Sequence, residues 1–296
     1  MPSWNQVLQE LETSDLKNPL DAIRHSYVKK LADYRGRNVI AYYSGFLQHP
    51  GLAAASIDDN DKNGLMAAIH ELDRTKGLDL LLHTPGGDLC ATESIIDYLY
   101  RMFEGNIHAF VPQIAMSAGT MIACSTKKIY MGKQSNLGPI DPQIGGVPAY
   151  AVVKEFQDAI TAVTENPASI PIWQTLIGKY HPTYVGLCQN AIKMADEMVT
   201  RSLERTMFGA QQNAKHDAKS IVDFLNEHEN SKMHARHINI DEAKNCGLVI
   251  EDLEADSCLQ DLVLTVHHCF MHTFSNSRAI KIIENQNENT TVIFKQ

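Results

Sequence analysis

Strand-length apolar runs alternate with amphipathic helical patterns between Val39 and Met131, and this alternation leaves few folds open to the chain. The expected strands and helices, in chain order, are 39–46, 61–76, 78–83, 89–103, 107–114, 117–124 and 128–131. Strands that alternate with helices form a mostly parallel sheet through right-handed crossovers, with helices on both faces. The pattern therefore predicts an α/β fold.

The whole chain divides into three expected parts. Residues 1–36 have a helical pattern and are interpreted as a docking or oligomerisation arm, and residues 37–255 form the main domain. The second half of that domain is helix-rich beyond the hinge at 145–148, with helices expected at 149–164, 171–179, 182–207 and 220–227 and a strand at 248–253. Residues 256–296 are expected to add a helix at 256–274 and short β-like runs at 279–283 and 291–294.

Composition limits the classes of partner. The chain has 296 residues, of which 44% are hydrophobic and 21% charged, so it can bury a substantial core. Because 26 Lys and Arg oppose 35 Asp and Glu, the formal charge is -9. An acidic balance argues against nucleic acid or an anionic membrane as the main partner.

Three further features predict a cytoplasmic protein without an integral membrane segment. The acidic first fifteen residues contain no apolar signal region. The six cysteines are far apart and form no Cys-x-x-Cys pair, so we expect reduced, buried thiols. The uncharged stretch 106–126 is long enough for a membrane span, but its proline, glycine and hydroxyl residues favour a buried strand, turn and helix. No phosphate-binding glycine loop is present, and no cofactor is expected.

Two short segments rich in glycine and other small residues follow two of the expected strands. His83-Thr84-Pro85-Gly86-Gly87 follows the strand 78–83, and Ala115-Met116-Ser117-Ala118-Gly119 follows the strand 107–114. Backbone amides of a glycine turn at the start of a helix can bind an anion, and Ser117 supplies a hydroxyl at a strand-to-helix turn. The pair predicts an oxyanion hole facing a serine nucleophile. The alternative is that Ser117 only caps the helix.

These residues, together with Ser135-Asn136-Leu137-Gly138-Pro139-Ile140-Asp141-Pro142-Gln143, give the chain its resemblance to a known family. The sequence resembles the serine dehydrogenase proteinase family, a branch of the ClpP and signal peptide peptidase A type of protease. The resemblance implies a ClpP/crotonase-like fold, with a mostly parallel sheet, flanking helices and a helix-rich C-terminal half. It also implies Ser117 as nucleophile and the backbone amides of Gly86 and Ala118 as the oxyanion hole, with Gly87 and Asp141 in the substrate-binding loops.

The general base is the residue by which the two branches of this type of protease differ. No histidine lies between His108 and His181, although the ClpP branch has one about twenty-five residues after its serine. The other branch uses a lysine, and Lys154 lies at a similar distance after Ser117. Burial in an apolar helix would lower the pKa of such an amine. The alternative is that Lys154 is an ordinary solvated surface residue. The other candidates for the base are Lys127, Lys128, Lys133 or a histidine that folds back towards the site.

Other candidate residues have ordinary structural explanations. His83 is expected to hydrogen-bond at the sheet edge, and Asp141 either orients substrate or a second subunit, or satisfies amides in an Asx turn. His234 and His237 form a short His-x-x-His with no completing ligand, so no metal is assigned.

The leading hypothesis is an ATP-independent serine peptidase that cleaves peptides or unfolded protein through a Ser117–Lys154 dyad and an acyl-enzyme. A crotonase-like acyl-CoA enzyme is a second possibility, because paired amides can also polarise a thioester carbonyl. A third is an oligomeric scaffold that binds peptides without cutting them. The resemblance implies a homo-oligomer in each case, since a free cytoplasmic protease needs its site enclosed.

Overall fold

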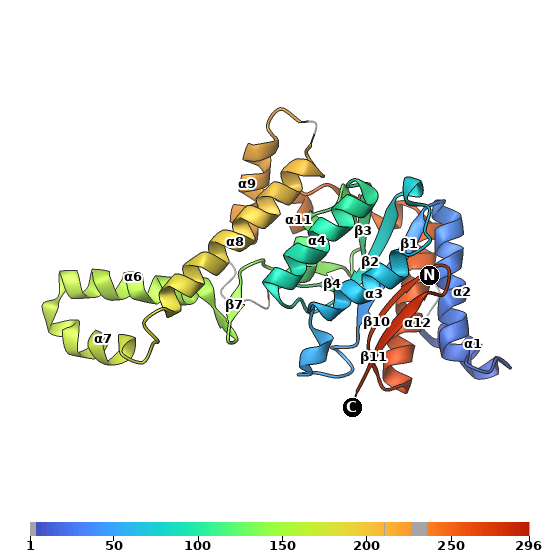
Figure 1. The fold of residues 1–296 in the computed structure, drawn as a ribbon, viewed down its shortest axis with the longest axis horizontal. Coiled ribbons are helices and arrows are strands. Elements are labelled where there is room, and N and C mark those ends of the chain that lie inside the picture. Colours follow the sequence, from blue (N-terminus) through green and yellow to red (C-terminus); the bar gives the residue numbers. More distant parts are fainter. Residues whose placement is uncertain (1–3, 210, 227–235, 296) are drawn as a thin grey trace.

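A computed structural model describes residues 4–209, 211–226 and 236–295 (Figure 1). Its centre is a seven-stranded sheet in the order β11-β10-β1-β2-β3-β5-β9. The strands are β1 (Asn38–Ser44), β2 (Leu78–His83), β3 (Ile107–Val111), β5 (Lys128–Met131), β9 (Ile250–Asp252), β10 (Ala279–Asn285) and β11 (Thr290–Phe294). β1, β2, β3, β5 and β9 are parallel neighbours, whereas β10 and β11 are antiparallel. The prediction of a mostly parallel α/β sheet is confirmed.

Helices cover both faces of the sheet. α2 (Pro19–Arg35) and α12 (Ser257–Asn276) pack on the face that carries Val39, Ala41 and Tyr43. The other face carries Ile40, Tyr42 and Leu80, and its core includes apolar side chains of α3 (Asn60–Ile69), α4 (Leu89–Phe103), α5 (Ala118–Cys124) and α8 (Tyr184–Arg205). Successive β1 residues therefore alternate between two cores, as the period of a strand requires.

The two ends of the chain meet on one side of this sheet. α1 (Trp4–Thr13) packs on α2 and α12, where Val7, Ile23 and Cys269 form a small apolar cluster. β10 lies between β1 and β11, so the last strands extend the parallel sheet beyond β1. The division of the chain at residues 36 and 255 stays a prediction. In the structure, the first part contacts the last through α1, α2 and α12, and the last part contacts the main domain through β10 and β1.

The helix-rich second half contains a projecting arm. A short hairpin of β7 (Gln143–Ile144) and β8 (Val147–Pro148) leads into α6 (Ala149–Glu165), the turn η3 (Pro167–Ser169) and α7 (Ile170–Ile177). α6 and α7 extend away from the sheet, and α8 runs back to it (Figure 1). α9 (Ala214–Leu225) packs against α8, and α11 (Ile240–Asn245) precedes β9.

Some predicted elements have different bounds in the structure. The helix expected at 61–76 ends at Ile69, because Glu71 adopts a left-handed φ of 63° and Asp73 then caps the short turn η2 (Arg74–Lys76). The strand expected at 107–114 divides at Pro112 into β3 and β4 (Ile114–Ala115), since proline cannot donate to a sheet ladder. β4 pairs with β6 (Asn136–Leu137) outside the main sheet. The remaining short turns, η1 (Ala53–Ala55) and η4 (Leu253–Ala255), follow β1 and β9.

Within the described ranges, no helix is both long enough and apolar enough to cross a membrane. The uncharged stretch 106–126 forms β3, β4 and α5, and most of its side chains are buried inside the protein. The six cysteines are free thiols. Cys90 and Cys258 are exposed and Cys246 is half-buried, so the expectation that all six are buried is wrong for these three.

Candidate active site

The two glycine-containing segments, 83–87 and 115–119, lie side by side at the carboxyl ends of their strands. The Thr84 amide donates to the Ile114 carbonyl at 3.2 Å, and the Met116 amide donates to the Thr84 carbonyl at 3.0 Å. These bonds make a parallel bridge between Thr84 and Ala115. The glycine turn that follows Thr84 is therefore held against the residue that follows Met116, which is Ser117.

Ser117 has a strained backbone and a free hydroxyl. Its φ of 50° and ψ of -114° lie outside the regions that L residues usually adopt. The side chain accepts no hydrogen bond from the first turn of α5, and among the described residues no partner of its hydroxyl is found. The capping alternative is therefore not realised. Strain of this kind costs about 1–3 kcal/mol and occurs often at functional sites, where it exposes a side chain.

Gly86 fits closely beneath Ser117. Its φ is +97°, and an added Cβ would lie 2.8 Å from the Ser117 Cβ and 3.1 Å from the Ala118 nitrogen. Only glycine can occupy this position without displacing the serine. The Gly86 amide donates to Thr84 Oγ1 at 3.2 Å, a long bond, so this expected oxyanion donor has a partner within its own turn.

Gly87 is held from the other side by Ile57. The Ile57 amide donates to the Gly86 carbonyl at 2.8 Å, and the Asp88 amide donates to the Ile57 carbonyl at 2.9 Å. Because the peptide is trans, a Gly86 carbonyl directed at Ile57 turns the Gly87 amide the opposite way. The Ala118 amide is the first of α5 and has no partner within that helix. The Gly87 amide is therefore not bonded in the bridge to Ile57, and the Ala118 amide is not bonded within α5.

A pocket of about 450 Å³ opens in front of these amides. Its lining is both polar and apolar and comes from the segment at Ser56, the glycine turn, α4, α5, the β7 hairpin and α8. The lining residues are Ser56, Pro85, Gly86, Gly87, Asp88, Leu89, Cys90, Ser117, Ala118, Met121, Pro142, Gln143, Ile144, Asn190, Ala191 and Met194. The structure therefore brings Ser117, Ala118, Gly86 and Gly87 together, as the sequence predicts, and adds two methionines that sequence patterns did not single out.

The lysine proposed as base lies outside this pocket. Lys154 is on α6 with 68% of its side chain exposed, and its Nζ pairs with the Asp158 carboxylate at 2.8 Å. Of the competitors, Lys128 pairs with Glu251 at 2.9 Å, and Lys127 and Lys133 are exposed. No lysine or histidine of the described ranges lines the pocket. Within the described part of one copy, the serine and the amides therefore have no lysine or histidine beside them in the pocket lining.

A different serine and lysine are in hydrogen-bond contact. Lys62 Nζ on α3 donates to Ser94 Oγ on α4 at 2.8 Å. Neither residue lines the Ser117 pocket. Ser94 is in the interior of α4, where backbone amides are bonded to the preceding turn and cannot receive an oxyanion. The pair lacks the donors that acyl transfer requires.

Asp141 and His83 lie near the site without facing it. Asp141 is buried, and its neighbours Pro142 and Gln143 line the pocket in its place. His83 is fully buried on the opposite face of the sheet, beside Tyr43 and His267. Neither of its ring nitrogens has a hydrogen-bond partner among the described residues, so the expected bond at the sheet edge is wrong. Burial lowers the pKa of His83 to about 3, which keeps the ring neutral.

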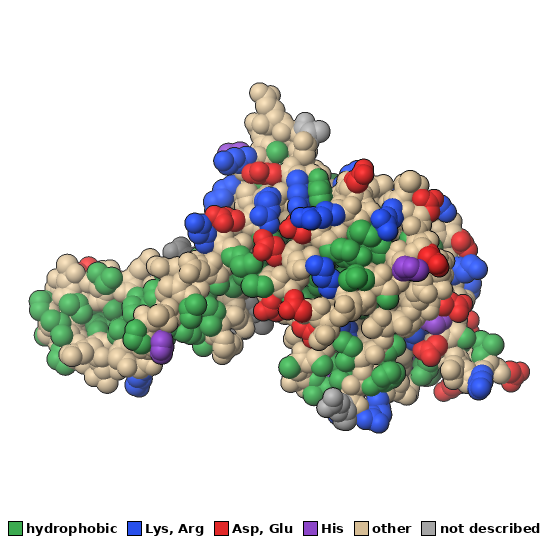
Figure 2. Space-filling model, viewed as in Figure 1, with side chains coloured by type: hydrophobic (Ala, Val, Ile, Leu, Met, Phe, Trp, Pro, Cys, Tyr) green, Lys and Arg blue, Asp and Glu red, His purple; other side chains and the backbone are tan. Residues whose placement is uncertain are grey.

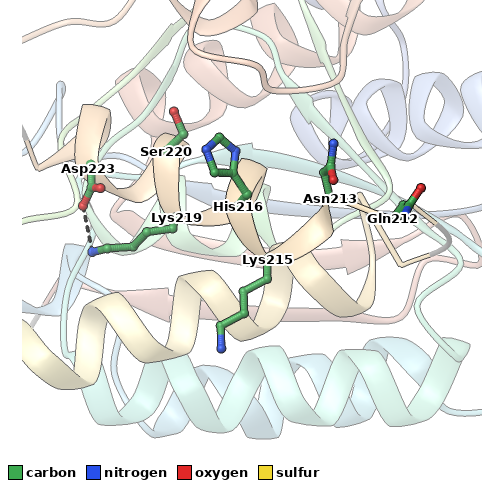
Figure 3. Close-up of a pocket in the computed structure, with 7 residues that line it drawn as sticks. All are labelled: Gln212, Asn213, Lys215, His216, Lys219, Ser220 and Asp223. Carbon is green, nitrogen blue, oxygen red and sulfur yellow. Dashed lines mark ion pairs between the residues drawn. The ribbon is translucent and has the colours of Figure 1, made fainter.

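A second hollow, of about 680 Å³, lies along α9 and carries Lys215, His216, Lys219 and Ser220 (Figure 3). Lys219 pairs with Asp223 at 2.7 Å, and both side chains are partly exposed. No three His, Cys, Asp or Glu side chains of the described residues converge on one point that could hold a metal ion. His234 lies outside the described residues. Among the described residues, an unpartnered serine hydroxyl, unused backbone amides and a pocket therefore come together at Ser117.

A mostly parallel sheet that carries a strained serine against a glycine turn defines a ClpP-like α/β protein. The chain belongs to the family described as ClpP-like SDH-type serine proteinase, which it matches over residues 12–262. Two relatives come from Methanocaldococcus jannaschii, and both are uncharacterized. MJ0137 is 29% identical over 78% of this chain and 74% of its own length. MJ1495 is 29% identical over 66% of this chain and 62% of its own length.

Proposed function

We propose that the chain is an ATP-independent serine endopeptidase in which Ser117 attacks a peptide carbonyl to form an acyl-enzyme. The observation that carries the proposal is the position of the unpartnered Ser117 hydroxyl, next to the Gly86 turn and beside the pocket. In the attack, the serine oxygen bonds to the carbonyl carbon and the developing oxyanion receives hydrogen bonds from backbone amides. The base takes the serine proton and gives it to the leaving nitrogen as the peptide C–N bond breaks, and water then hydrolyses the acyl-enzyme to regenerate the serine.

The oxyanion donors in this proposal are the Ala118 amide and an amide of the glycine turn. Gly86 is the donor implied by the family resemblance, but its amide already donates to Thr84 Oγ1. The Gly87 amide is directed away from Ile57, and Gly87 lines the pocket. This geometry favours Gly87 as the donor, with Gly86 providing the space for the substrate carbonyl. Asp141 then supports the loop at Pro142 and Gln143.

Lys154 is proposed as the general base, supplied by a second copy of the chain. Within one copy it is on the projecting α6 and is not part of the pocket. The same arm exposes apolar side chains that self-association would cover, and Figure 2 shows hydrophobic side chains gathered on it. Ile160, Ile170, Ile172 and Leu176 are exposed on α6 and α7. A lysine that leaves water at such an interface has its pKa lowered and can accept the serine proton.

Complementation tests the proposal. Ser117→Ala and Lys154→Ala proteins should each be inactive on a fluorogenic peptide. If the lysine acts across an interface, a one-to-one mixture refolded together should recover about a quarter of the wild-type rate, as expected for random pairing in a dimer. Full activity of Ser117→Ala would contradict the nucleophile. Loss of activity in Lys154→Ala without recovery on mixing would place the lysine in the same copy.

A non-catalytic peptide-binding scaffold is the second candidate, and the absence of a base from the pocket lining of one described copy favours it. Such a protein would bind a peptide in the pocket and return it intact. Mass spectrometry of a peptide after long incubation separates the two candidates, because the peptidase yields two fragments.

A further inference from the structure

A buried lysine from near the C-terminus contacts the back of the pocket wall. Lys281 is on β10, and its Nζ donates to the Ser56 carbonyl at 2.6 Å and to Asp61 Oδ1 at 2.7 Å. Both side chains are fully buried. The Tyr42 hydroxyl also donates to Asp61 Oδ2 at 2.7 Å. Buried ion pairs repay their desolvation only when further hydrogen bonds complete them, and this pair is completed on both sides.

The segment that Lys281 holds is the one that bonds to the glycine turn. Ser56 lines the Ser117 pocket, and Ile57 follows it. The Ile57 amide and carbonyl bond to Gly86 and Asp88, as described above. Contact is so close that a Cβ on Gly87 would lie 2.3 Å from the Ile57 nitrogen. A displacement of Ser56 and Ile57 would therefore move the Gly86–Gly87 peptide directly.

The segment that contains Ser56 and Ile57 is held at a second point by the neighbouring strand β1. Ser44 at the end of β1 faces Lys281 in the β1–β10 register. Its hydroxyl donates to the Ala55 carbonyl at 2.6 Å, one residue before the carbonyl that Lys281 binds. β10 also lies beyond residue 262, where the match to the family ends. The C-terminal strands thus contribute to the pocket a support that the family match does not include.

We propose that Lys281 and Asp61 are positioning residues for the oxyanion hole. Through Ser56 and Ile57 they fix the orientation of the Gly86–Gly87 peptide, so that its amide faces a carbonyl bound at Ser117. Neither side chain touches the substrate. This inference rests on the proposed peptidase function for its kinetic consequence, but the structural coupling can be measured without it.

The kinetic test replaces the pair by apolar residues of similar size. Lys281→Met with Asp61→Leu removes both charges, and a substitution of this kind leaves a protein folded when the packing is kept. The matched control is Arg24→Met with Glu284→Leu, a second buried ion pair at 2.9 Å whose carboxylate is also on β10. We expect kcat to fall about a hundredfold in the first variant with little change in KM, because misplacing a catalytic group by about 1 Å has this effect. The control should keep the wild-type kcat.

Amide hydrogen exchange measures the coupling independently of catalysis. The Ile57 and Asp88 amides should exchange at least about tenfold faster in the Lys281→Met/Asp61→Leu protein, since local opening exposes the bonds between them and the turn. They should keep their protection in the control. If wild-type protein cleaves no peptide, the proposed function fails while this measurement still decides the coupling.

A milder variant covers the case in which the double variant does not fold. Tyr42→Phe removes one hydrogen bond to Asp61 and keeps the ring. It should lower kcat several-fold with unchanged KM and loosen the Ile57 amide. A folded variant of either kind with wild-type kcat and wild-type exchange at Ile57 and Asp88 would overturn the inference.

Discussion

Gly86 lies so close to Ser117 that a Cβ on the glycine would stand 2.8 Å from the Cβ of the serine. This relationship joins the turn after β2 to the turn after β4, which are separated in the sequence by α4 and β3. A glycine at this position keeps the pocket side of Ser117 open for a substrate carbonyl. Any side chain at residue 86 would therefore disturb both the nucleophile and the neighbouring Ala118 amide.

Replacing Gly86 by alanine should therefore disable the site. The added methyl group would collide with Ser117 and crowd the Ala118 amide, and the φ of +97° would be strained in addition. We expect peptide hydrolysis to fall about a hundred- to a thousandfold, as after removal of an oxyanion donor. Gly145→Ala is the matched control, because Gly145 also has a positive φ, of 61°, but has open space around it. Equal losses in both variants would mean that backbone strain alone explains the effect.

Cys90 offers a chemical probe of the pocket. It is exposed and lines the cavity beside Ser117, whereas Cys258 is exposed at the start of α12. Alkylation with N-ethylmaleimide should block substrate access and reduce turnover at least about tenfold, since a pocket of this size cannot hold both groups. Cys90→Ser protein should resist the reagent, and Cys258→Ser protein should remain sensitive. Inhibition that persists in Cys90→Ser would show that another thiol is responsible.

His83 should make the fold sensitive to acid. Burial lowers the pKa of His83 from 6.5 to about 3. Between these two pH values the imidazole is protonated in the unfolded chain and neutral in the native protein. Native stability is then lost progressively as the pH falls from about 6.5 towards 3, by about 2 kcal/mol at pH 5. His83→Leu removes this penalty. Thermal unfolding at pH 7.5 and pH 5 should show a smaller drop in the variant than in wild type, while exposed His70→Leu should behave as wild type.

Self-association should depend on the projecting arm. Ile160 and Ile172 expose 69% and 65% of their surface on α6 and α7, and burying such side chains is the main source of affinity at an interface. Ile160→Asp with Ile172→Asp should lower the mass measured by light scattering and the peptidase rate together. Met66→Asp changes an apolar residue that is also exposed, on α3, and should alter neither. An unchanged mass in the arm variant would exclude α6 and α7 as the interface.

The parallel core and the serine turn were predictable because local signals determine them. Leu78–His83 and Ile107–Val111 are mostly apolar runs, and each leads to a glycine or serine turn. Short runs of this kind, bounded by turn residues, are typical of strands buried in a parallel sheet. The position of Ser117 next to Gly86 follows from the parallel pairing of neighbouring strands, which brings their carboxyl ends to one edge.

Long-range pairing was harder to foresee. Nothing local indicates that β10 joins β1, or that Lys281 and Asp61 meet across 220 residues of sequence. A buried lysine has the same sequence signature as a solvated one, so Lys281 gave no signal. Lys154 illustrates the converse, because its apolar surroundings in the sequence are those of an arm whose surface is largely exposed. The burial of a charge depends on tertiary contacts that periodicity does not encode.

The nucleophile is the central claim, and covalent labelling tests it most directly. Wild-type protein, Ser117→Ala and Ser94→Ala would be treated with a fluorophosphonate and mapped by peptide mass spectrometry. Ser94 is the proper comparison, because its hydroxyl accepts a hydrogen bond from Lys62 and yet lies outside the pocket. We predict a single adduct on the peptide that contains Ser117, present in wild type and in Ser94→Ala and absent from Ser117→Ala. An adduct that persists in Ser117→Ala, or no adduct on Ser117 in an active wild-type protein, would contradict the account.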